Sequence, residues 1–261
     1  MVKKMALKTG TFKTGKDNLD ILQKEVAIMK KICHENLVRL YEIIDDDEGG
    51  KIYFIMDYMD LGSLGGSRHL SFLGCKEPCL PVENIWNYFR QSVSGLDYCM
   101  LKKLLFLSIP FCSLTILVHN IAKVIHFDIK PDNILINKSD VIKIADFGIS
   151  KMKSKSENFS KVGGTRMFLP PETWLEKFFK GSPVDIWALA ISFYFLRFGF
   201  YPFSSADMNI FNKLVETQEI TFPDGCDPQF KDLIQKMTFK NPNERITLFE
   251  IMEHPYITKN G

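Results

Sequence analysis

The sequence predicts an α+β fold of two lobes, a small β-rich lobe followed by a larger, mainly helical one. Two observations indicate this division. The first 60 residues combine one helical pattern with two strand-like runs, whereas most segments after Pro183 have the periodicity of helices. The chain of 261 residues is long enough to bury a sizeable core, and two lobes would leave a cleft where a ligand can bind.

The small lobe is predicted to hold one helix and one hairpin. Residues 19–33 have apolar side chains at a spacing that forms one helix face. The members of that face are Ile21, Leu22, Val26, Met29 and Ile32. Residues 36–44 and 51–59 are strand-like, and the acidic, glycine-ended run 45–50 between them predicts a hairpin with a loop of more than two residues.

The large lobe is predicted to be helical around a short β element. A helix is expected at residues 82–99, and two short β-rich runs follow at 133–139 and 141–147. Further helices are expected at residues 184–198, 208–217, 228–238 and 247–253. The polar run 153–161 is rich in Ser and Lys and is expected to be irregular.

Composition excludes several classes of function. A net charge of +2 gives no concentrated basic face, so no nucleic-acid partner is expected. The most apolar run, residues 104–118, is shorter than the roughly 20 residues of a membrane span, and no signal peptide is found at the start. The six cysteines are scattered in a chain that needs no disulfides. We therefore expect a cytoplasmic protein with reduced thiols and no membrane partner.

The run "HFDIKPDNILI", residues 126–136, places several polar groups directly before a buried-looking strand. Transfer of a phosphoryl group needs a carboxylate near the attacking hydroxyl, a cation on the γ-phosphate and a divalent metal. Asp128 can orient the hydroxyl or accept its proton, and Lys130 can reach the phosphate. Asn133 offers a neutral oxygen to a metal, and Asp146 follows as a second oxygen ligand.

The metal expected at this site is Mg²⁺. Magnesium is bound by few protein oxygens, because it keeps several waters and shares the substrate phosphates. Asn133 and Asp146 supply such oxygens, and the hairpin between them would bring the two side by side. A second interpretation is that these residues only form the turns of a β-hairpin.

The pattern H-x-D-x-K-P-x-N followed by D-F-G resembles the catalytic and metal-binding motifs of eukaryotic protein kinases. The resemblance covers nearly the whole chain and implies a two-lobed kinase fold, with residues 1–60 as a partial N-lobe and hinge and 61–261 as the C-lobe. It implies Ser/Thr protein kinase activity with ATP and Mg²⁺, and a protein as substrate. Asp128, Lys130 and Asn133 would be the catalytic residues.

The resemblance also implies the residues that bind ATP. In the family, a lysine on a strand holds the α- and β-phosphates and pairs with an acidic residue of the first helix. Glu25 fits the acidic residue, and the strand would end at "MVKKM", with Lys3 as the lysine and Lys4 as the alternative. The other residues assigned to the ATP site are Met56, Asp57, Met59, Leu135 and Asp146.

Downstream motifs resemble the substrate platform of the same family. Residues 163–172, "GGTRMFLPPE", supply Thr165 and Glu172. The start of "DIWALA" supplies Asp185, and "NPNERIT" supplies Arg245, which in the family pairs with the glutamate of the platform, here Glu172. Asp185 and Arg245 are expected to have structural roles.

Within the family, the chain most resembles the calcium/calmodulin-dependent protein kinase kinases. The segments "LQKEVAIMKKICHENLVRLYEIIDD", "FKDLIQKM", "KNPNERI" and "HPYITKNG" carry this resemblance. It suggests another kinase as the substrate. Calmodulin is a partner of such kinases, but the regulatory segment that would bind it is expected beyond Gly261.

Three departures from the family pattern bear on function. The Gly-rich loop is expected upstream of Lys3 and has no counterpart in this chain, so the N-lobe is expected to lack two strands. Phe127 replaces the arginine that in many kinases pairs with an activating phosphate, which predicts that catalysis is kept and this form of control is lost. Residues 100–118 interrupt the usual spacing and are either a functional insert or a mis-spliced segment.

Three functions remain open on the sequence. The first is an active Ser/Thr protein kinase, and the second is a pseudokinase or kinase-fold scaffold without activity in this form. The third, a kinase-like enzyme acting on small molecules, is disfavoured because Gly164–Thr165 and Pro171–Glu172 resemble the platform that receives a protein substrate. Binding of Mg·ATP and phosphorylation of protein would distinguish the first two.

Overall fold

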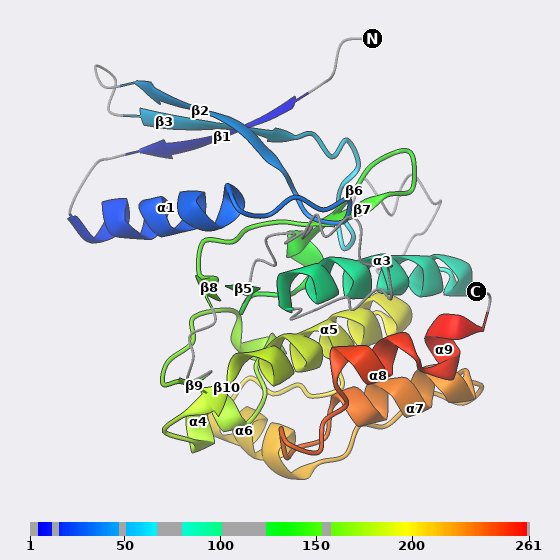
Figure 1. The fold of residues 1–261 in the computed structure, drawn as a ribbon. Coiled ribbons are helices and arrows are strands. Elements are labelled where there is room, and N and C mark those ends of the chain that lie inside the picture. The colour runs from blue at the N-terminus through cyan, green and yellow to red at the C-terminus, as the bar shows by residue number, and fades with distance from the viewer. Residues whose placement is uncertain are drawn as a thin grey trace, which may run out of the picture.

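The computed structural model describes residues 5–11, 16–46, 51–66, 80–100, 124–152 and 158–259. A three-stranded sheet and helix α1 form a small lobe, and the other helices form a larger lobe below it (Figure 1). The predicted two-lobed α+β fold class is therefore confirmed.

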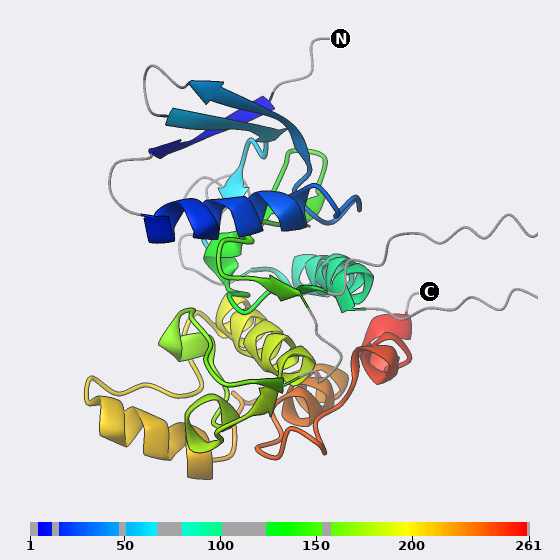
Figure 2. The ribbon, with the colours of Figure 1, turned by 60° about the vertical axis from the view of Figure 1, so that its left-hand side comes forward.

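The small lobe is an antiparallel sheet flanked by one helix. Its elements are β1 (Met5–Thr11), α1 (Lys16–Met29), β2 (Leu40–Asp46) and β3 (Lys51–Asp57). The strand order is β1-β3-β2, and α1 runs alongside the sheet on the side of the large lobe (Figure 2). The predicted helix and both predicted strands are present.

Strand β2 begins later than predicted because the preceding residues bond to the other lobe. The Val38 N–H donates to the Ile144 carbonyl at 2.9 Å, and the Ile144 N–H donates to the Asn36 carbonyl at 2.9 Å. These residues therefore connect α1 to strand β7 in the large lobe.

The predicted end of the first strand at residues 1–5 is wrong. Strand β1 begins at Met5 and continues to Thr11, and it pairs with β3 from Met5↔Asp57 to Thr11↔Lys51. Pairing along the whole length of β3 holds this run extended although its second half, "KTGT", contains no apolar residue. Residues 1–4, including Lys3 and Lys4, lie outside the described residues.

The large lobe contains the predicted helices and several short strands. The predicted helices are α3 (Val82–Met100), α5 (Gly181–Phe198), α6 (Met208–Thr217), α7 (Pro228–Met237) and α8 (Leu248–Met252). Two short helices, α4 (Glu172–Leu175) and α9 (Pro255–Thr258), were not predicted. The 3₁₀ turns are η1 (Pro131–Asn133) and η2 (Arg166–Phe168). The strands are β4 (Gly62–Ser63), β5 (Val124–Ile125), β6 (Ile134–Ile136), β7 (Ile142–Ile144), β8 (Lys151–Met152), β9 (Asn158–Phe159) and β10 (Phe179–Lys180).

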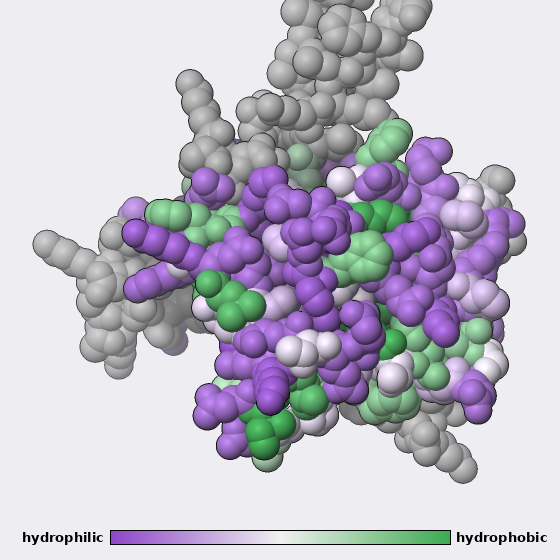
Figure 3. All heavy atoms as spheres, turned by 90° about the horizontal axis from the view of Figure 1, so that it is seen from below, coloured by the Kyte–Doolittle hydropathy of each residue, from purple (hydrophilic) through white to green (hydrophobic). Residues whose placement is uncertain are grey.

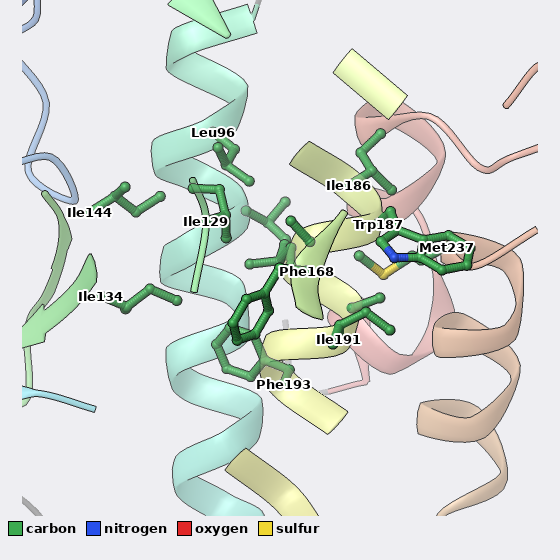
Figure 4. Packing of buried hydrophobic residues seen from close by; sticks show 14 of the residues in the cluster. Leu96, Ile129, Ile134, Ile144, Phe168, Ile186, Trp187, Ile191, Phe193 and Met237 are labelled. Carbon is green, nitrogen blue, oxygen red and sulfur yellow. The ribbon is translucent and has the colours of Figure 1, made fainter. Parts of the chain in front are cut away.

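The core of the large lobe lies between α3 and α5. Figure 4 shows side chains of both helices, together with Ile129, Ile134 and Ile144 from the loop and hairpin, converging on one cluster. Helix α5 is apolar around most of its circumference, which is typical of a helix at the centre of a domain. The polar run 126–136 packs on this core through residues such as Ile129 and Ile134.

The face of the large lobe seen from below is mostly hydrophilic among the described residues (Figure 3). Seen from below, hydrophobic residues form separate spots among hydrophilic ones (Figure 3). Exposed large apolar side chains are spread over different elements, for example Leu175, Ile210 and Phe249, which is normal for a globular protein. Within the described ranges, none of the helices is both long enough and apolar enough to cross a membrane.

Two segments depart from their expected course. Within the run 153–161, expected to be irregular, residues 158–159 form strand β9 and pair with β10, with Phe159 opposite Phe179. Residue Met100, the first of the segment 100–118, is buried in the last turn of α3. The rest of that segment lies outside the described residues.

Candidate active site

The loop that carries Asp128 is held by a buried carboxylate from the central helix. The N–H groups of His126 and Phe127 donate to the two oxygens of Asp185, each at 2.7 Å. Burial raises the pKa of Asp185 to about 7, against the two hydrogen bonds, which lower it. Asp185 therefore satisfies two backbone donors that the loop would otherwise bury without partners.

Phe127 has a backbone conformation that is rare for its residue type. Its φ is 65°, in the left-handed region, where a bulky residue costs about 1–3 kcal/mol. Such a conformation persists only when surrounding contacts favour it. Here these contacts are the bond to Asp185 and the burial of the ring, which is 1% exposed.

The Asp128 carboxylate is surrounded by donors. One oxygen, Oδ1, accepts from the N–H and Oγ1 of Thr165 at 3.1 and 3.2 Å. The other, Oδ2, lies 2.8 Å from Lys130 Nζ and accepts from Asn133 Nδ2 at 3.0 Å. Lys130 Nζ also donates to Thr165 Oγ1 at 2.8 Å, which closes a ring of three side chains. The structure thus brings together four of the residues singled out in the sequence.

The protonation states of the loop favour Asp128 as the base. Burial alone would raise the pKa of Asp128, but the hydrogen bond and charge of Lys130, with the bonds from Thr165 and Asn133, hold it below its ordinary value. Burial lowers the pKa of His126, whose Nε2 lies 3.0 Å from the Ala145 carbonyl. At neutral pH, Asp128 is therefore ionised, and His126 is a neutral, packed imidazole.

Asn133 and Asp146 are brought together by the β6–β7 hairpin. Ile134 pairs with Ile144, and the N–H of Ala145, next to Asp146, donates to the Asn133 carbonyl at 2.8 Å. The amide nitrogen of Asn133 is bonded to Asp128, so its Oδ1 is the atom that can face a cation. No group of three or more His, Cys, Asp or Glu residues with metal-binding geometry occurs among the described residues. One amide oxygen and one carboxylate fit Mg²⁺, which takes its other ligands from water and phosphates.

Helix α1 brings Glu25 to the same place. The side chain is buried, at 7% exposed. A β-carbon on Gly148 would lie 3.3 Å from Asp146 Oδ1 and 3.7 Å from Glu25 Oε2, so both carboxylates border the backbone of Gly148. The lysine expected to pair with Glu25 lies outside the described residues.

Asp57, predicted to belong to the ATP site, is the last residue of strand β3, and its side chain has contacts that were not predicted. Its carboxylate accepts from Tyr41 Oη at 2.7 Å and from the Arg39 N–H at 3.0 Å, and it forms an ion pair with Lys143 Nζ at 3.1 Å. Burial opposes ionisation, but these partners hold the pKa of Asp57 below its ordinary value. The Asp57 side chain therefore ties the small lobe to β7.

The other residues predicted for the ATP site lie on β3, in the loop after it and on β6. Met56 is partly buried against the core, and Met59 is 7% exposed. Leu135 is on β6, paired with Ser63 on one side and Lys143 on the other. Their part in binding ATP remains a prediction.

Glu172 and Arg245 form a buried ion pair. Arg245 Nη1 and Nη2 donate to the two oxygens of Glu172 at 2.7 and 3.0 Å, and both side chains are at most 1% exposed. The same guanidinium donates to the carbonyls of Phe239 and Pro183. This pair ties the end of the platform to the last third of the chain.

Arg166, within the platform segment 163–172, has contacts that were not predicted. The Arg166 guanidinium lies 3.5 Å from the Trp174 ring centroid and donates to Asn212 Oδ1 at 2.5 Å. Trp174 Nε1 donates to Glu216 Oε1 at 2.7 Å. No local sequence pattern indicates this network, because its members are far apart along the chain.

The arrangement of charges defines the class of protein. An ionised carboxylate lies beside a lysine, and the oxygens suited to a metal lie on the next hairpin, between two lobes. Phosphoryl transfer requires such positioning of charge and little covalent chemistry from the protein. The site is therefore that of a phosphotransferase.

Comparison with known proteins identifies the family. Residues 1–109 and 112–257 match the family described as the protein kinase domain. The chain belongs to this family, and its relatives are serine/threonine-protein kinases.

Three relatives illustrate the similarity. The serine/threonine-protein kinase ssp1 of Schizosaccharomyces pombe is 32% identical over 90% of this chain and 34% of its own length. The calcium/calmodulin-dependent protein kinase kinase of Caenorhabditis elegans is 30% identical over 93% of this chain and 41% of its own length. The serine/threonine-protein kinase GRIK1 of Arabidopsis thaliana is 33% identical over 92% of this chain and 54% of its own length. The chain thus spans about a third to a half of these relatives.

Proposed function

We propose that this chain is the catalytic domain of a Ser/Thr protein kinase that transfers the γ-phosphoryl group of ATP to a hydroxyl group of a protein. The observation that carries the proposal is the ring formed by Asp128, Lys130 and Thr165, with Asn133 bonded to the same carboxylate. A hairpin turn alone would not need a carboxylate with four donors around it.

Each residue of the ring has a role in the transfer. Asp128 orients the substrate hydroxyl and takes its proton as the oxygen–phosphorus bond forms. Lys130 places its charge beside the transferred phosphoryl oxygens, while the bond from the γ-phosphorus to the bridging oxygen breaks and ADP leaves. Asn133 and Asp146 would hold Mg²⁺, which neutralises the phosphate charge when bound. Thr165 joins the platform to the base.

We further propose that the substrate is itself a protein kinase and that the protein works in the cytoplasm. Support for the substrate comes from the Caenorhabditis elegans relative, which is named a kinase kinase. Support for the location comes from the described cysteines Cys33, Cys99 and Cys226, which are free thiols.

The test replaces the base and an exposed neighbour in the full-length protein. Asp128→Asn should lower kcat for a protein substrate by roughly 10²–10⁴, while the affinity for Mg·ATP changes little. Asp132→Asn is the matched control, because Asp132 lies four residues away on the same loop and is exposed. Equal activity of the two variants would show that Asp128 is not the base.

The same measurements address the pseudokinase alternative. Binding of Mg·ATP is measured first by calorimetry, and phosphoryl transfer is measured on a panel of inactive kinases offered as substrates. If the wild-type protein binds Mg·ATP but phosphorylates neither the inactive kinases nor a general protein substrate, it is a pseudokinase. The proposed activity would then be rejected.

A further inference from the structure

Three aromatic rings, one of them from the catalytic loop, pack against one another. The Phe127 ring is 5.0 Å from the Phe159 ring and 6.5 Å from the Phe179 ring, both edge to face. The three rings come from the catalytic loop, β9 and β10, and Phe159 is opposite Phe179 in the β9–β10 pair. Aromatic pairs in this geometry attract each other beyond the burial of their surfaces. The cluster therefore joins β9, in the segment between Asp146 and Glu172, to the catalytic loop.

A lysine covers this cluster and makes a second connection. Lys151 Nζ lies 5.7 Å from the centroid of the Phe127 ring and 5.8 Å from that of the Phe159 ring, within cation–π range. The same nitrogen donates to the Lys161 carbonyl at 2.5 Å. Lys151 thereby bridges the start of the segment, at β8, to the residues that follow β9.

Two glycines show how closely the segment approaches the loop. A β-carbon on Gly181 would lie 2.7 Å from the Ile125 side chain and 2.9 Å from the Phe159 ring. A β-carbon on Gly164, whose φ is +107°, would lie 2.5 Å from the Phe127 carbonyl oxygen. The segment therefore touches Phe127 twice, at its ring through Phe159 and at its carbonyl through Gly164.

The contact at Gly164 lies next to the hydrogen-bonded ring formed by Asp128, Lys130 and Thr165. Thr165 follows Gly164, and both its N–H and its hydroxyl donate to Asp128. The position of Thr165 therefore depends on contacts that begin at Phe159. In these contacts the segment is held by aromatic rings and one lysine, with no anionic group among them.

We propose that Phe127, Phe159, Phe179 and Lys151 form an aromatic latch that positions Thr165 against Asp128 without a phosphate on the segment. These four are positioning residues, and the inference rests on the proposed kinase activity. It extends that activity by stating how the site is kept assembled.

The experiment compares variants of the full-length protein. In Phe159→Ala, kcat should fall about 10–100-fold, because small displacements of a positioned group reduce the rate strongly, while the KM for ATP stays within about twofold. Phe159→Tyr keeps the ring and should retain most of the activity. Phe178→Ala is the matched control, since Phe178 is 54% exposed and its neighbour Phe179 belongs to the latch. Wild-type protein treated with a phosphatase should keep its activity within about twofold.

Hydrogen exchange separates the latch from a general loss of stability. In Phe159→Ala, exchange should increase at residues 158–165, with the core helices α5 and α7 protected as in the wild type. Equal kcat in Phe159→Ala and Phe178→Ala, or inactivation of the wild type by the phosphatase, would overturn the latch. If the wild type transfers no phosphate at all, the proposed function fails. The latch is tested separately, because unchanged exchange at residues 158–165 in Phe159→Ala would reject it whatever the activity.

Discussion

Removal of the Arg245 guanidinium should be among the most destabilising single changes in the large lobe. Arg245→Met keeps the apolar stem but leaves Glu172 buried without its partner. The guanidinium makes five hydrogen bonds, two to Glu172, two to the Phe239 carbonyl and one to the Pro183 carbonyl. Loss of one partner of such a pair leaves a buried charge and unsatisfied acceptors.

The expected loss follows from the burial of the pair. Breaking a buried ion pair from one side typically costs about 3–5 kcal/mol of unfolding free energy. For a chain of this size, each kcal/mol lowers the melting temperature by about 2–4 °C, so Tm should fall by about 6–20 °C. An exposed pair contributes about 0–1 kcal/mol, and Lys259–Asp227, with side chains 27% and 33% exposed, provides that comparison.

Thermal and urea unfolding of three variants tests this reasoning. Arg245→Met should unfold far below the wild type, and Lys259→Met should unfold close to it. The double variant Glu172→Gln with Arg245→Met should recover part of the loss, because it no longer buries an unpaired charge. A loss under about 1 kcal/mol in Arg245→Met would show that the pair is not isolated from water as its burial implies.

Three further outcomes are expected. Changing Ser154, Ser156 or Ser160 to Ala should alter activity less than about threefold, because a phosphate there has no arginine partner in the catalytic loop, and a tenfold loss in the Ser160 variant would contradict this. Deleting residues 101–118, with Met100 kept because it is buried in α3, should raise the soluble yield and leave Tm within a few degrees, and a larger fall would make the segment integral structure. Gly164→Ala should reduce kcat about tenfold or more, since its β-carbon would lie 2.5 Å from the Phe127 carbonyl, and full activity would show that the loop can move aside.

The long elements of the fold could be predicted from the sequence because their signals are local. Helices α3, α5 and α7 have apolar side chains at helical spacing, and most of this spacing survives in the structure as their buried faces. The two-residue strands β9 and β10 could not be predicted, because two residues carry no periodicity. Their extended form comes from pairing with each other, although they are separated by the whole platform.

The candidate site also combines features that a local sequence pattern predicts with features that depend on distant contacts. Asp128, Lys130, Asn133 and Asp146 lie within 19 consecutive residues, so their proximity is a property of one loop and one hairpin. The ion pair of Asp57 with Lys143 and the contact of Phe127 with Phe159 join segments that have no sequence relation to each other. Contacts of that kind depend on how distant segments pack together, which no local pattern records.

These distant contacts explain how a strained loop can hold the Asp128 carboxylate in place. Phe127 has a left-handed backbone, and within the run 126–136 a hydrogen bond from the Asp128 N–H to His126 Nδ1, at 3.2 Å, spans it. Further contacts come from three directions: Asp185 from the central helix, Phe159 from β9, and Gly164 against the carbonyl. Because Asp128 follows Phe127 directly, the three contacts that position Phe127 also position the Asp128 carboxylate. The position of the Asp128 carboxylate is therefore set by the assembled large lobe, and with the proposed latch a change at Phe159 should alter it without changing any residue proposed to bind ATP.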